Sequence, residues 1–286
     1  MRVMVIGARG QLGAAIVREC EPRHEVIAFG HDTLDITGDE AVAAAVAGAR
    51  PDVIVNCAAY NDVDGAEDHP IDALNVNAFA VRALARAAAA NNATLVHYST
   101  DFVFDGTGAE PYTEADPPNP RSTYAASKLL GEWFAADAPR AYVLRVESLF
   151  GRAPGAGPAK GSVASIVKML LAGGEARVFE DRTVSPTYIM DAAKATLQLV
   201  ARNPAAPSGL YHCVNSGRCT WLEFAHELAR QLGVEPRIVP IRMADVTLRA
   251  ERPRYCALSN AKLAAAGIVM PSWQDAVARF VGANHP

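Results

Sequence analysis

Tyr124 and Lys128 are the residues whose types and spacing first suggest chemistry. They lie four positions apart in the segment RSTYAASKLLGEW, with Ser127 as a small residue beside the lysine and no assigned role. Positions i and i+4 of a helix share a face, so the two side chains can converge. An ammonium beside a phenol lowers a pKa that is ordinarily about 10. Such a tyrosine can donate a proton near neutral pH; the alternative is an amphipathic helix with an ordinary polar pair.

Three glycines near the N-terminus suggest a site for a phosphate group. The segment GARGQLG places Gly7, Gly10 and Gly13 directly after an apolar run and at the start of a helical pattern. Glycines there let the backbone approach a pyrophosphate, which the N–H groups at a helix N-terminus stabilise. The G-x-x-G-x-x-G spacing differs from the G-x-G-x-x-G of most dehydrogenases, so three turn glycines are the structural alternative.

The choice between nicotinamide cofactors depends on the residues at the end of the second apolar run. An acidic residue there would bind the ribose 2'-hydroxyl and favour NAD, but Gly30 and His31 stand at that point. Arg9 and His31 could instead meet a 2'-phosphate, so we expect NADPH, with NADH as the second choice. The LDIT segment can place Asp35 and Ile36 near the adenine, or its polar residues can cap a helix.

Small and hydroxyl-bearing residues follow the third and fourth apolar runs. Ala58 and Ala59 belong to NCAAY, and Ser99 and Thr100 belong to YSTDFVFDG. Ligands of an open parallel sheet collect at the carboxyl ends of its strands, so these residues stand where cofactor and substrate would meet. The alternative is that serine and threonine simply end a strand.

The elements that would position these residues alternate between strand and helix. The apolar runs are short and nearly continuous, as in strands buried on both faces of a parallel sheet; they cover residues 2–6, 25–29, 52–56, 94–99 and 141–146. Ala-rich helical patterns lie between them, at residues 11–20, 39–47, 71–91 and 124–136. This order predicts right-handed crossovers and an α/β fold with a Rossmann-like, doubly wound parallel sheet.

A change in composition after residue 150 suggests a second region. Residues 151–162 contain four glycines and two prolines, which is typical of a loop. We therefore expect an NAD(P)-binding Rossmann domain at 1–150 and a smaller C-terminal α/β region at 151–286 that mainly binds substrate. Strand-like pieces lie at 176–180 and 209–214, and some segments of this region should return to the main sheet.

Composition limits the classes of partner. The chain has 286 residues and a net charge of -4, without a long block of one sign, which argues against nucleic acid or an anionic membrane. The five cysteines and seven histidines are scattered and predict neither a disulfide framework nor a metal site. No apolar stretch approaches the roughly 20 residues of a membrane span. We expect a cytoplasmic protein with a small soluble ligand, and we allow for a homodimer.

Together these motifs resemble an extended short-chain dehydrogenase/reductase. The segments GQLG, LDIT, NCAAYNDVDGAE, STDFVFDG, YAASKLLGE, SPTY and RPRYCALSNAKL are similar, in order, to those of dTDP-4-dehydrorhamnose reductases. The resemblance covers essentially the whole chain. It implies NAD(P)H-dependent reduction of a 4-keto-6-deoxyhexose attached to a nucleoside diphosphate, most simply dTDP-4-dehydro-L-rhamnose to dTDP-L-rhamnose.

The resemblance also implies roles for individual residues. Tyr124 would protonate the developing alkoxide, and Lys128 would hold the nicotinamide ribose and lower the pKa of the tyrosine. Thr100 would hydrogen-bond the substrate oxygen, and Asp101 would line the sugar pocket. The resemblance places Gly10, Gln11, Leu12, Asp35, Ile36, Ala58, Ala59, Tyr60, Tyr124 and Lys128 around the cofactor; with the residues singled out above, the expected cofactor-binding set also includes Gly7, Arg9, Gly13, His31 and Tyr98.

Several arginines precede the C-terminal segment, and one of them matches the family pattern. Arg252 falls in the RP motif and could bind the substrate's diphosphate through its forked guanidinium. Its neighbours Arg242, Arg249 and Arg254 are explained as well by a solvated surface.

Two segments depart from the family pattern, both on the substrate side. The chain reads RVESLFG where relatives have a Trp-containing RTSW segment, with Ser148 in the place of the tryptophan. EDRTVSPTY, residues 180–188, replaces the usual DQxGxPT pattern. The sequence therefore predicts the reductase chemistry more firmly than the identity of the sugar substrate.

The sequence also bears on two other classes of function. A hydrolase is excluded because the chain lacks a G-x-S-x-G elbow. A non-catalytic, NADP-binding regulatory subunit, like that of methionine adenosyltransferase, is the alternative to an enzyme, although Thr100, Tyr124 and Lys128 favour the enzyme.

Overall fold

The described residues, 1–157 and 161–284 of a computed structural model, form a main sheet of six parallel strands. The strand order is β10-β5-β4-β3-β1-β2. The strands are β1 (Arg2–Ile6), β2 (Glu25–Phe29), β3 (Val53–Asn56), β4 (Thr94–Thr100), β5 (Ala141–Val146) and β10 (Gly209–His212). β1 pairs with both β2 and β3, so the winding direction reverses beside β1. Such a switch point opens a crevice at the carboxyl ends of the strands.

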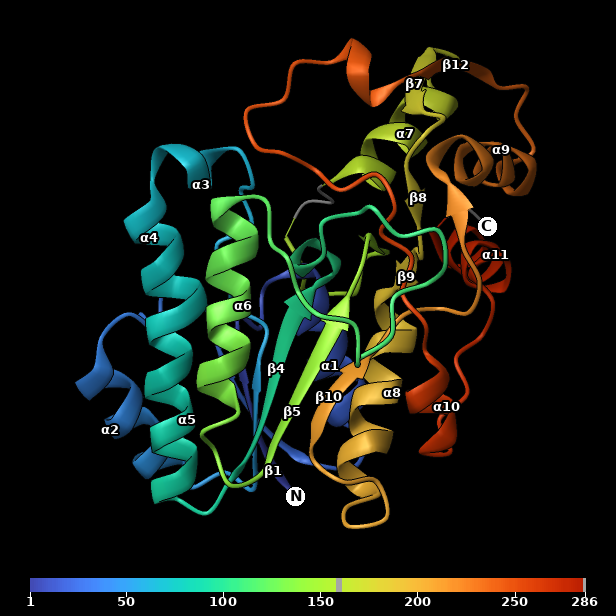
Figure 1. Ribbon diagram of the computed structural model, residues 1–286. Coiled ribbons are helices and arrows are strands. Elements are labelled where there is room, and N and C mark those ends of the chain that lie inside the picture. The colour runs from blue at the N-terminus through green and yellow to red at the C-terminus, as the bar shows by residue number, and fades with distance from the viewer. Residues whose placement is uncertain (158–160, 285–286) are drawn as a thin grey trace.

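Each central strand supplies two hydrophobic cores because its side chains alternate between the faces of the sheet. In β1, Val3 and Val5 belong to one core, whereas Met4 and Ile6 belong to the other. Figure 1 shows the helices that cover these faces. One face carries α2 (Asp39–Ala49), α5 (Ala80–Ala90) and α6 (Thr123–Ala135), and the other carries α1 (Gln11–Cys20) and α8 (Ile189–Ala201). The predicted doubly wound α/β fold is confirmed.

β2 is less buried than predicted: the sequence indicated a strand covered on both faces. It lies at the edge of the main sheet, and Glu25 and Ala28 are exposed. The short apolar run EVIAF does not reveal this position, because the edge is set by which strands pair later in the chain.

The helix predicted over residues 71–91 is interrupted. It consists of α4 (Pro70–Leu74), a π-helical turn at Asn75–Phe79 and α5, and it is preceded by α3 (Gly65–Asp68). The turn packs closely against α6, because a Cβ on Gly131 would lie 2.1 Å from the carbonyl oxygen of Asn77. π-turns are frequent at functional sites, and this one carries Asn77 toward the crevice side of the sheet.

The C-terminal part of the chain forms a smaller α/β lobe beside the crevice, at the upper right of Figure 1. β7 (Glu175–Phe179) pairs with β12 (Arg237–Ile241), and β8 (Thr183–Val184) pairs with β11 (Cys219–Thr220). Its helices and remaining short elements are α7 (Ser162–Leu171), α9 (Trp221–Leu232), α11 (Trp273–Asn284), β6 (Leu149–Phe150) and β9 (Thr187–Tyr188). The short helix α10 (Ala261–Ala265) instead packs beside β10 of the main sheet. Single 3₁₀ turns lie at Asp101–Val103 and Met243–Asp245.

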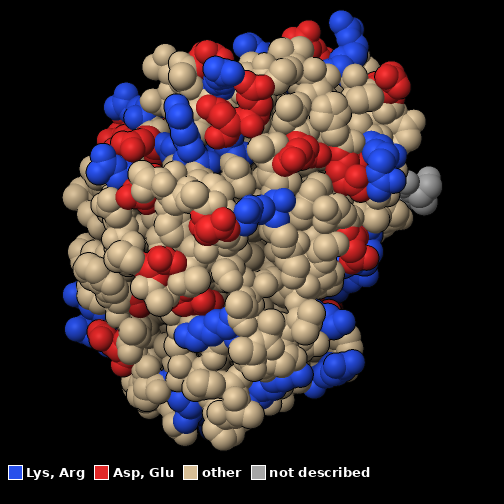
Figure 2. Space-filling model, turned by 45° about the vertical axis from the view of Figure 1, so that its right-hand side comes forward, with Lys and Arg blue, Asp and Glu red and all other residues tan. Residues whose placement is uncertain are grey.

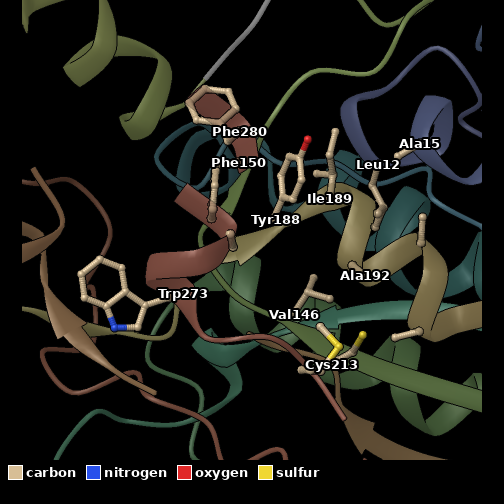
Figure 3. Close-up of a cluster of buried hydrophobic side chains, with 14 of the residues drawn as sticks. Leu12, Ala15, Val146, Phe150, Tyr188, Ile189, Ala192, Cys213, Trp273 and Phe280 are labelled. Carbon is tan, nitrogen blue, oxygen red and sulfur yellow. The ribbon is translucent and has the colours of Figure 1, made fainter. Parts of the chain in front are cut away.

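The chain returns from this lobe to the main sheet. α8 packs beside α1, and β10 pairs with β5 in parallel. Aromatic rings join the two parts, with the Phe150 ring 5.5 Å from that of Tyr188 and 5.6 Å from that of Phe280. Figure 3 shows these rings in one cluster with Leu12 of α1. The division at residue 150 stays a prediction, and part of its glycine-rich boundary, 158–160, lies outside the described residues.

The surface carries intermingled charges of both signs, as Figure 2 shows for one face. Among the described helices, none has the length and hydropathy needed to cross a bilayer. All five cysteines are free thiols, and four of them are buried.

Candidate active site

A cavity of about 990 Å³ opens at the carboxyl ends of β1, β3, β4 and β5, near the upper end of the roughly 300–1,000 Å³ typical of ligand sites. Twelve of the residues predicted from the sequence line it: Arg9, Gly10, Gln11, Leu12, Ala58, Ala59, Tyr98, Thr100, Asp101, Tyr124, Lys128 and Arg252. The other predicted residues lie outside its lining: Gly7, Gly13, His31, Asp35, Ile36 and Tyr60.

The glycine loop shapes one end of the cavity. Gly7 has a φ of +73°, and a Cβ there would lie 2.8 Å from the amide nitrogen of Ala58. A Cβ on Gly13 would lie 2.1 Å from the Gly7 carbonyl oxygen. Both glycines therefore act through close packing, which lets Gly10 and the start of α1 face the cavity and offer N–H groups to a phosphate. The side-chain amide of Gln11 donates a hydrogen bond to the Gly151 carbonyl at 2.8 Å. This bond ties the glycine loop to the segment that follows β6.

The residues expected to bind the adenosine half of the cofactor do not come together at the cavity. An acidic residue, Asp32, does follow β2. Its carboxylate forms an ion pair with Arg9 at 2.9 Å. Asp35 accepts hydrogen bonds from the amide and the hydroxyl of Thr37. The alternative of a helix cap by Thr37 or Asp39 is wrong, because α2 is preceded by Gly38 and has no side-chain cap. Ile36 is buried in the core, and His31 is exposed. Arg9 is the member of this group that lines the cavity.

Two buried asparagines hold the loop that follows β3. Asn56 accepts a hydrogen bond from the Ala58 amide at 3.1 Å. Asn77 accepts from the Tyr60 amide at 2.8 Å and donates to the Tyr60 carbonyl at 3.0 Å and to Ser127 Oγ at 3.0 Å. Ser127, which the sequence left without a role, thereby links this loop to α6. The sequence reasoning missed the role of both asparagines; the available signal was a polar amide within a largely apolar segment.

The first turn of α6 is fixed from both sides. Ser122 caps the helix by accepting from the Ala125 amide at 3.3 Å. The Glu67 carboxylate accepts from the amide of Thr123 at 2.7 Å and from its hydroxyl at 2.9 Å. Tyr124 follows immediately, so its phenol is aimed into the cavity from an anchored helix end.

Tyr124 lies beside Thr100 and Asp101. The Thr100 hydroxyl donates to Asp101 Oδ1 at 3.0 Å. Burial raises the pKa of Tyr124 above its ordinary range and Asp101 adds to this, while a hydrogen bond with Thr100 lowers it. The expected lowering of this pKa by Lys128 is wrong for this structure, because burial and Asp101 set the pKa and Lys128 does not lower it. Tyr124 is consequently a neutral phenol at physiological pH.

Lys128 lies one turn further along α6 and is almost fully buried. Its Nζ donates to the Tyr98 carbonyl at 2.6 Å, and burial lowers the pKa of the amine to about 8. The Tyr98 side chain points away into the core, where its hydroxyl lies 2.6 Å from Thr196 Oγ1. Tyr98 therefore contributes a carbonyl group to the site.

Buried charged residues form the floor of the cavity next to Tyr124. Asp101, Glu147 and Arg182 line it, and each is at most 9% exposed. Burial raises the pKa of Asp101 to about 6, although Arg182 opposes this. Burial, reinforced by Asp101, holds the pKa of Glu147 well above its ordinary range. Ser148, beside them, has a φ of +43°, an uncommon conformation for a residue with a Cβ.

Ligand atoms suited to a metal come together in one group within residues 1–157 and 161–284. Oxygens of Asp101 and Glu147 and the sulfur of Cys256 lie within 4.8 Å of one another. Arg182 Nη2, however, lies 3.6 Å from Cys256 Sγ in hydrogen-bond contact. A guanidinium thus already supplies positive charge to this group.

Arg252 lines the other side of the cavity but is held by an acid. Its guanidinium donates to both oxygens of Asp64, at 2.9 and 2.7 Å. Arg249 pairs with Asp68, so two ion pairs connect the segment after β12 to the region of α3. Arg242 pairs with Glu180 at the surface.

Comparison with known proteins assigns the chain to a family. The model described as the RmlD substrate binding domain matches residues 1–285. A probable dTDP-4,6-dihydroxy-2-methyloxan-3-one 4-ketoreductase of Streptomyces antibioticus is 37% identical, over 100% of this chain and 98% of that protein. A dTDP-4-dehydrorhamnose reductase of Streptomyces griseus is 37% identical over 93% and 88%.

A solved structure agrees with these relatives. The dTDP-4-dehydrorhamnose reductase of Bacillus anthracis, in complex with NADP, superposes with a TM-score of 0.92 at 32% identity and covers 99% of both chains. Family model, relatives and structure all extend over nearly the whole length, and therefore the protein belongs to the RmlD substrate binding domain family.

Proposed function

We propose that the protein reduces the 4-keto group of a dTDP-linked 6-deoxyhexose with hydride from NADPH, and that its reaction is dTDP-4-dehydro-L-rhamnose to dTDP-L-rhamnose. The observation that carries this proposal is the convergence of Thr100, Tyr124 and Lys128 at one cavity with the glycine loop. The relatives named as reductases and ketoreductases of dTDP-linked sugars support the substrate class.

The arrangement suits protonation of an alkoxide. NADPH supplies hydride to the carbonyl carbon, and charge then develops on the carbonyl oxygen, which must accept a proton. Tyr124 is protonated at neutral pH because burial raises the pKa of its phenol. The raised pKa makes this phenol a weaker acid than usual, but an alkoxide is far more basic than a phenolate and can still take its proton, while Thr100 provides a second hydroxyl at the same point. Lys128, held by the Tyr98 carbonyl, places a positive charge beside the phenolate that forms.

The cofactor would extend from the glycine loop to the loop held by Asn77. The start of α1 and Arg9 offer donors to phosphates, and Ala58 and Ala59 provide a smooth wall beside the reacting centre. NADP in the Bacillus anthracis relative supports NADPH. NADH is the second choice because Asp32, which pairs with Arg9, can accept a hydrogen bond from a ribose hydroxyl.

Turnover with defined sugars tests this function. NADPH oxidation is measured with dTDP-, GDP- and UDP-linked 4-keto sugars for the wild type and for Tyr124→Phe. We expect the variant to lose about 10²- to 10⁴-fold in kcat, as is typical when a general acid is removed, with NADPH binding retained. Tyr211→Phe is the control, because that hydroxyl donates to the Pro207 carbonyl outside the cavity lining.

Two outcomes would contradict the proposal. Wild-type turnover by Tyr124→Phe would remove the proton donor. Tight NADPH binding without turnover of any sugar would remove the enzyme and favour the regulatory subunit.

A further inference from the structure

Two segments that depart from the family pattern meet at the floor of the cavity. Glu147 follows β5 in RVESLFG, and Arg182 precedes β8 in EDRTVSPTY. Both side chains line the cavity together with Asp101, and each is at least nine-tenths buried. Two departures from the family pattern, 35 positions apart in the sequence, therefore change the same part of the cavity wall, on the side where the sugar would bind.

The three side chains leave hydrogen-bonding atoms unused. Glu147 Oε2 accepts from the Ser185 amide at 2.6 Å, and Asp101 Oδ1 accepts from Thr100. Asp101 Oδ2, Glu147 Oε1 and Arg182 Nε are buried without a hydrogen-bond partner in the part of the chain that the structure describes. Such unpaired groups are costly, so they mark a place where a ligand or water completes the hydrogen bonds.

The floor is fixed next to the proton donor. The Arg182 guanidinium lies over the Phe102 ring, 5.3 Å from its centroid. The Phe102 ring in turn meets Tyr124 edge to face, with centroids 5.7 Å apart. A group bound by this floor would therefore belong to the same sugar ring as the carbonyl that Tyr124 protonates.

The unpaired atoms define the chemistry of that group. A guanidinium N–H can only donate, whereas a carboxylate oxygen accepts. A hydroxyl both donates and accepts, so it can satisfy atoms of both kinds. A methylene cannot, and it would leave all of them unpaired. A metal cation is disfavoured because Arg182 already contacts Cys256 beside the two carboxyls.

We propose that Glu147 and Arg182, with Asp101, bind a ring hydroxyl of the keto sugar and so select a fully hydroxylated 4-keto-6-deoxyhexose over a counterpart that lacks this hydroxyl. This inference rests on the proposed reductase function. Burial, reinforced by Asp101, holds the pKa of Glu147 well above its ordinary range, so its carboxyl serves as a donor to the sugar hydroxyl and Asp101 Oδ2 as an acceptor.

The test compares kcat/KM for dTDP-4-dehydro-L-rhamnose with its 2-deoxy and 3-deoxy counterparts. For the wild type we expect one of the two deoxy sugars to lose roughly 10- to 100-fold, the effect of leaving a buried polar group unpaired. Glu147→Ala and Arg182→Lys should each reduce that preference by about tenfold. Glu147→Gln should retain it, because its amide can accept from Ser185 and still donate to the sugar.

Controls separate selection from folding. Glu227→Ala, at the surface of α9, should leave the preference unchanged. Thermal unfolding and NADPH binding establish that each variant is folded. Equal kcat/KM for all three sugars in the wild type, or an unchanged preference in Glu147→Ala, would overturn the inference while leaving the reductase function intact. If the wild type reduced none of the sugars, the proposed reductase function itself would be overturned.

Discussion

Replacing Asn77 with aspartate should loosen the loop that forms the cofactor side of the cavity. The side chain is 1% exposed and donates two hydrogen bonds, to the Tyr60 carbonyl and to Ser127 Oγ, both at 3.0 Å. A carboxylate of the same shape can still accept from the Tyr60 amide but cannot donate. It also sets an oxygen against the Tyr60 carbonyl.

The size of the effect follows from these contacts. Two hydrogen bonds at about 1 kcal/mol each, with the cost of an unpaired buried carbonyl, give a loss of roughly 2–4 kcal/mol. For a chain of 286 residues, this lowers the melting temperature by about 3–7 °C. Burial raises the pKa of the introduced carboxyl above its value in the unfolded chain, so the loss grows as pH rises from 5 to 8.

The assay combines thermal unfolding at pH 5 and pH 8 with the KM for NADPH. We expect a raised KM, because the loop from Ala58 to Tyr60 no longer has one fixed position. Asn91→Asp is the matched control: this amide also donates to a backbone carbonyl, that of Ala87 at 2.9 Å, but away from the cavity, and should cost below about 1 kcal/mol. Wild-type melting at pH 8 with an unchanged KM for Asn77→Asp would refute the reasoning.

Two further predictions concern ion pairs. Glu132→Gln removes the negative charge beside the buried guanidinium of Arg145 and replaces one of its two 2.8 Å acceptors with an N–H group. This should cost about 3–5 kcal/mol in urea unfolding, whereas Glu227→Gln, whose partner Arg230 is exposed, should cost under about 1 kcal/mol; equal losses would contradict this. Hydrogen bonds from Arg252 lower the pKa of Asp64 from 3.8 to about 2, so the stabilisation is complete above pH 4 and lost as pH falls through 2. The difference in unfolding free energy between wild type and Asp64→Asn should vanish over that range, and a difference independent of pH would count against the pair.

Much of the main sheet could be predicted because its strands are local apolar runs. β1, β2 and β5 begin and end where the sequence predicts, and α1 does as well. The π-turn at Asn75–Phe79 was not apparent from the sequence, and its packing depends on the close approach of Gly131 on α6, a contact across 54 positions of sequence.

The residues of the site also fall into those that local sequence predicts and those that depend on tertiary packing. Tyr124, Lys128 and Thr100 were predicted because a helix period and a strand end bring them to one cavity. Glu147 and Arg182 were not, since their meeting depends on how the C-terminal lobe packs. The pKa of Tyr124 was predicted in the wrong direction because burial, a tertiary property, raises it and the charge of Asp101 adds to this.

The return of the chain to the main sheet limits how sugar specificity can be exchanged between relatives. A chimera with a single crossover after residue 150 would replace α8 and β10 together with the substrate lobe, and would have to rebuild the α1–α8 and β5–β10 contacts. Two further crossovers, one on each side of residues 189–212, would keep these elements with their own sheet. Engineering of this fold therefore favours transplanting two separate segments over joining two halves.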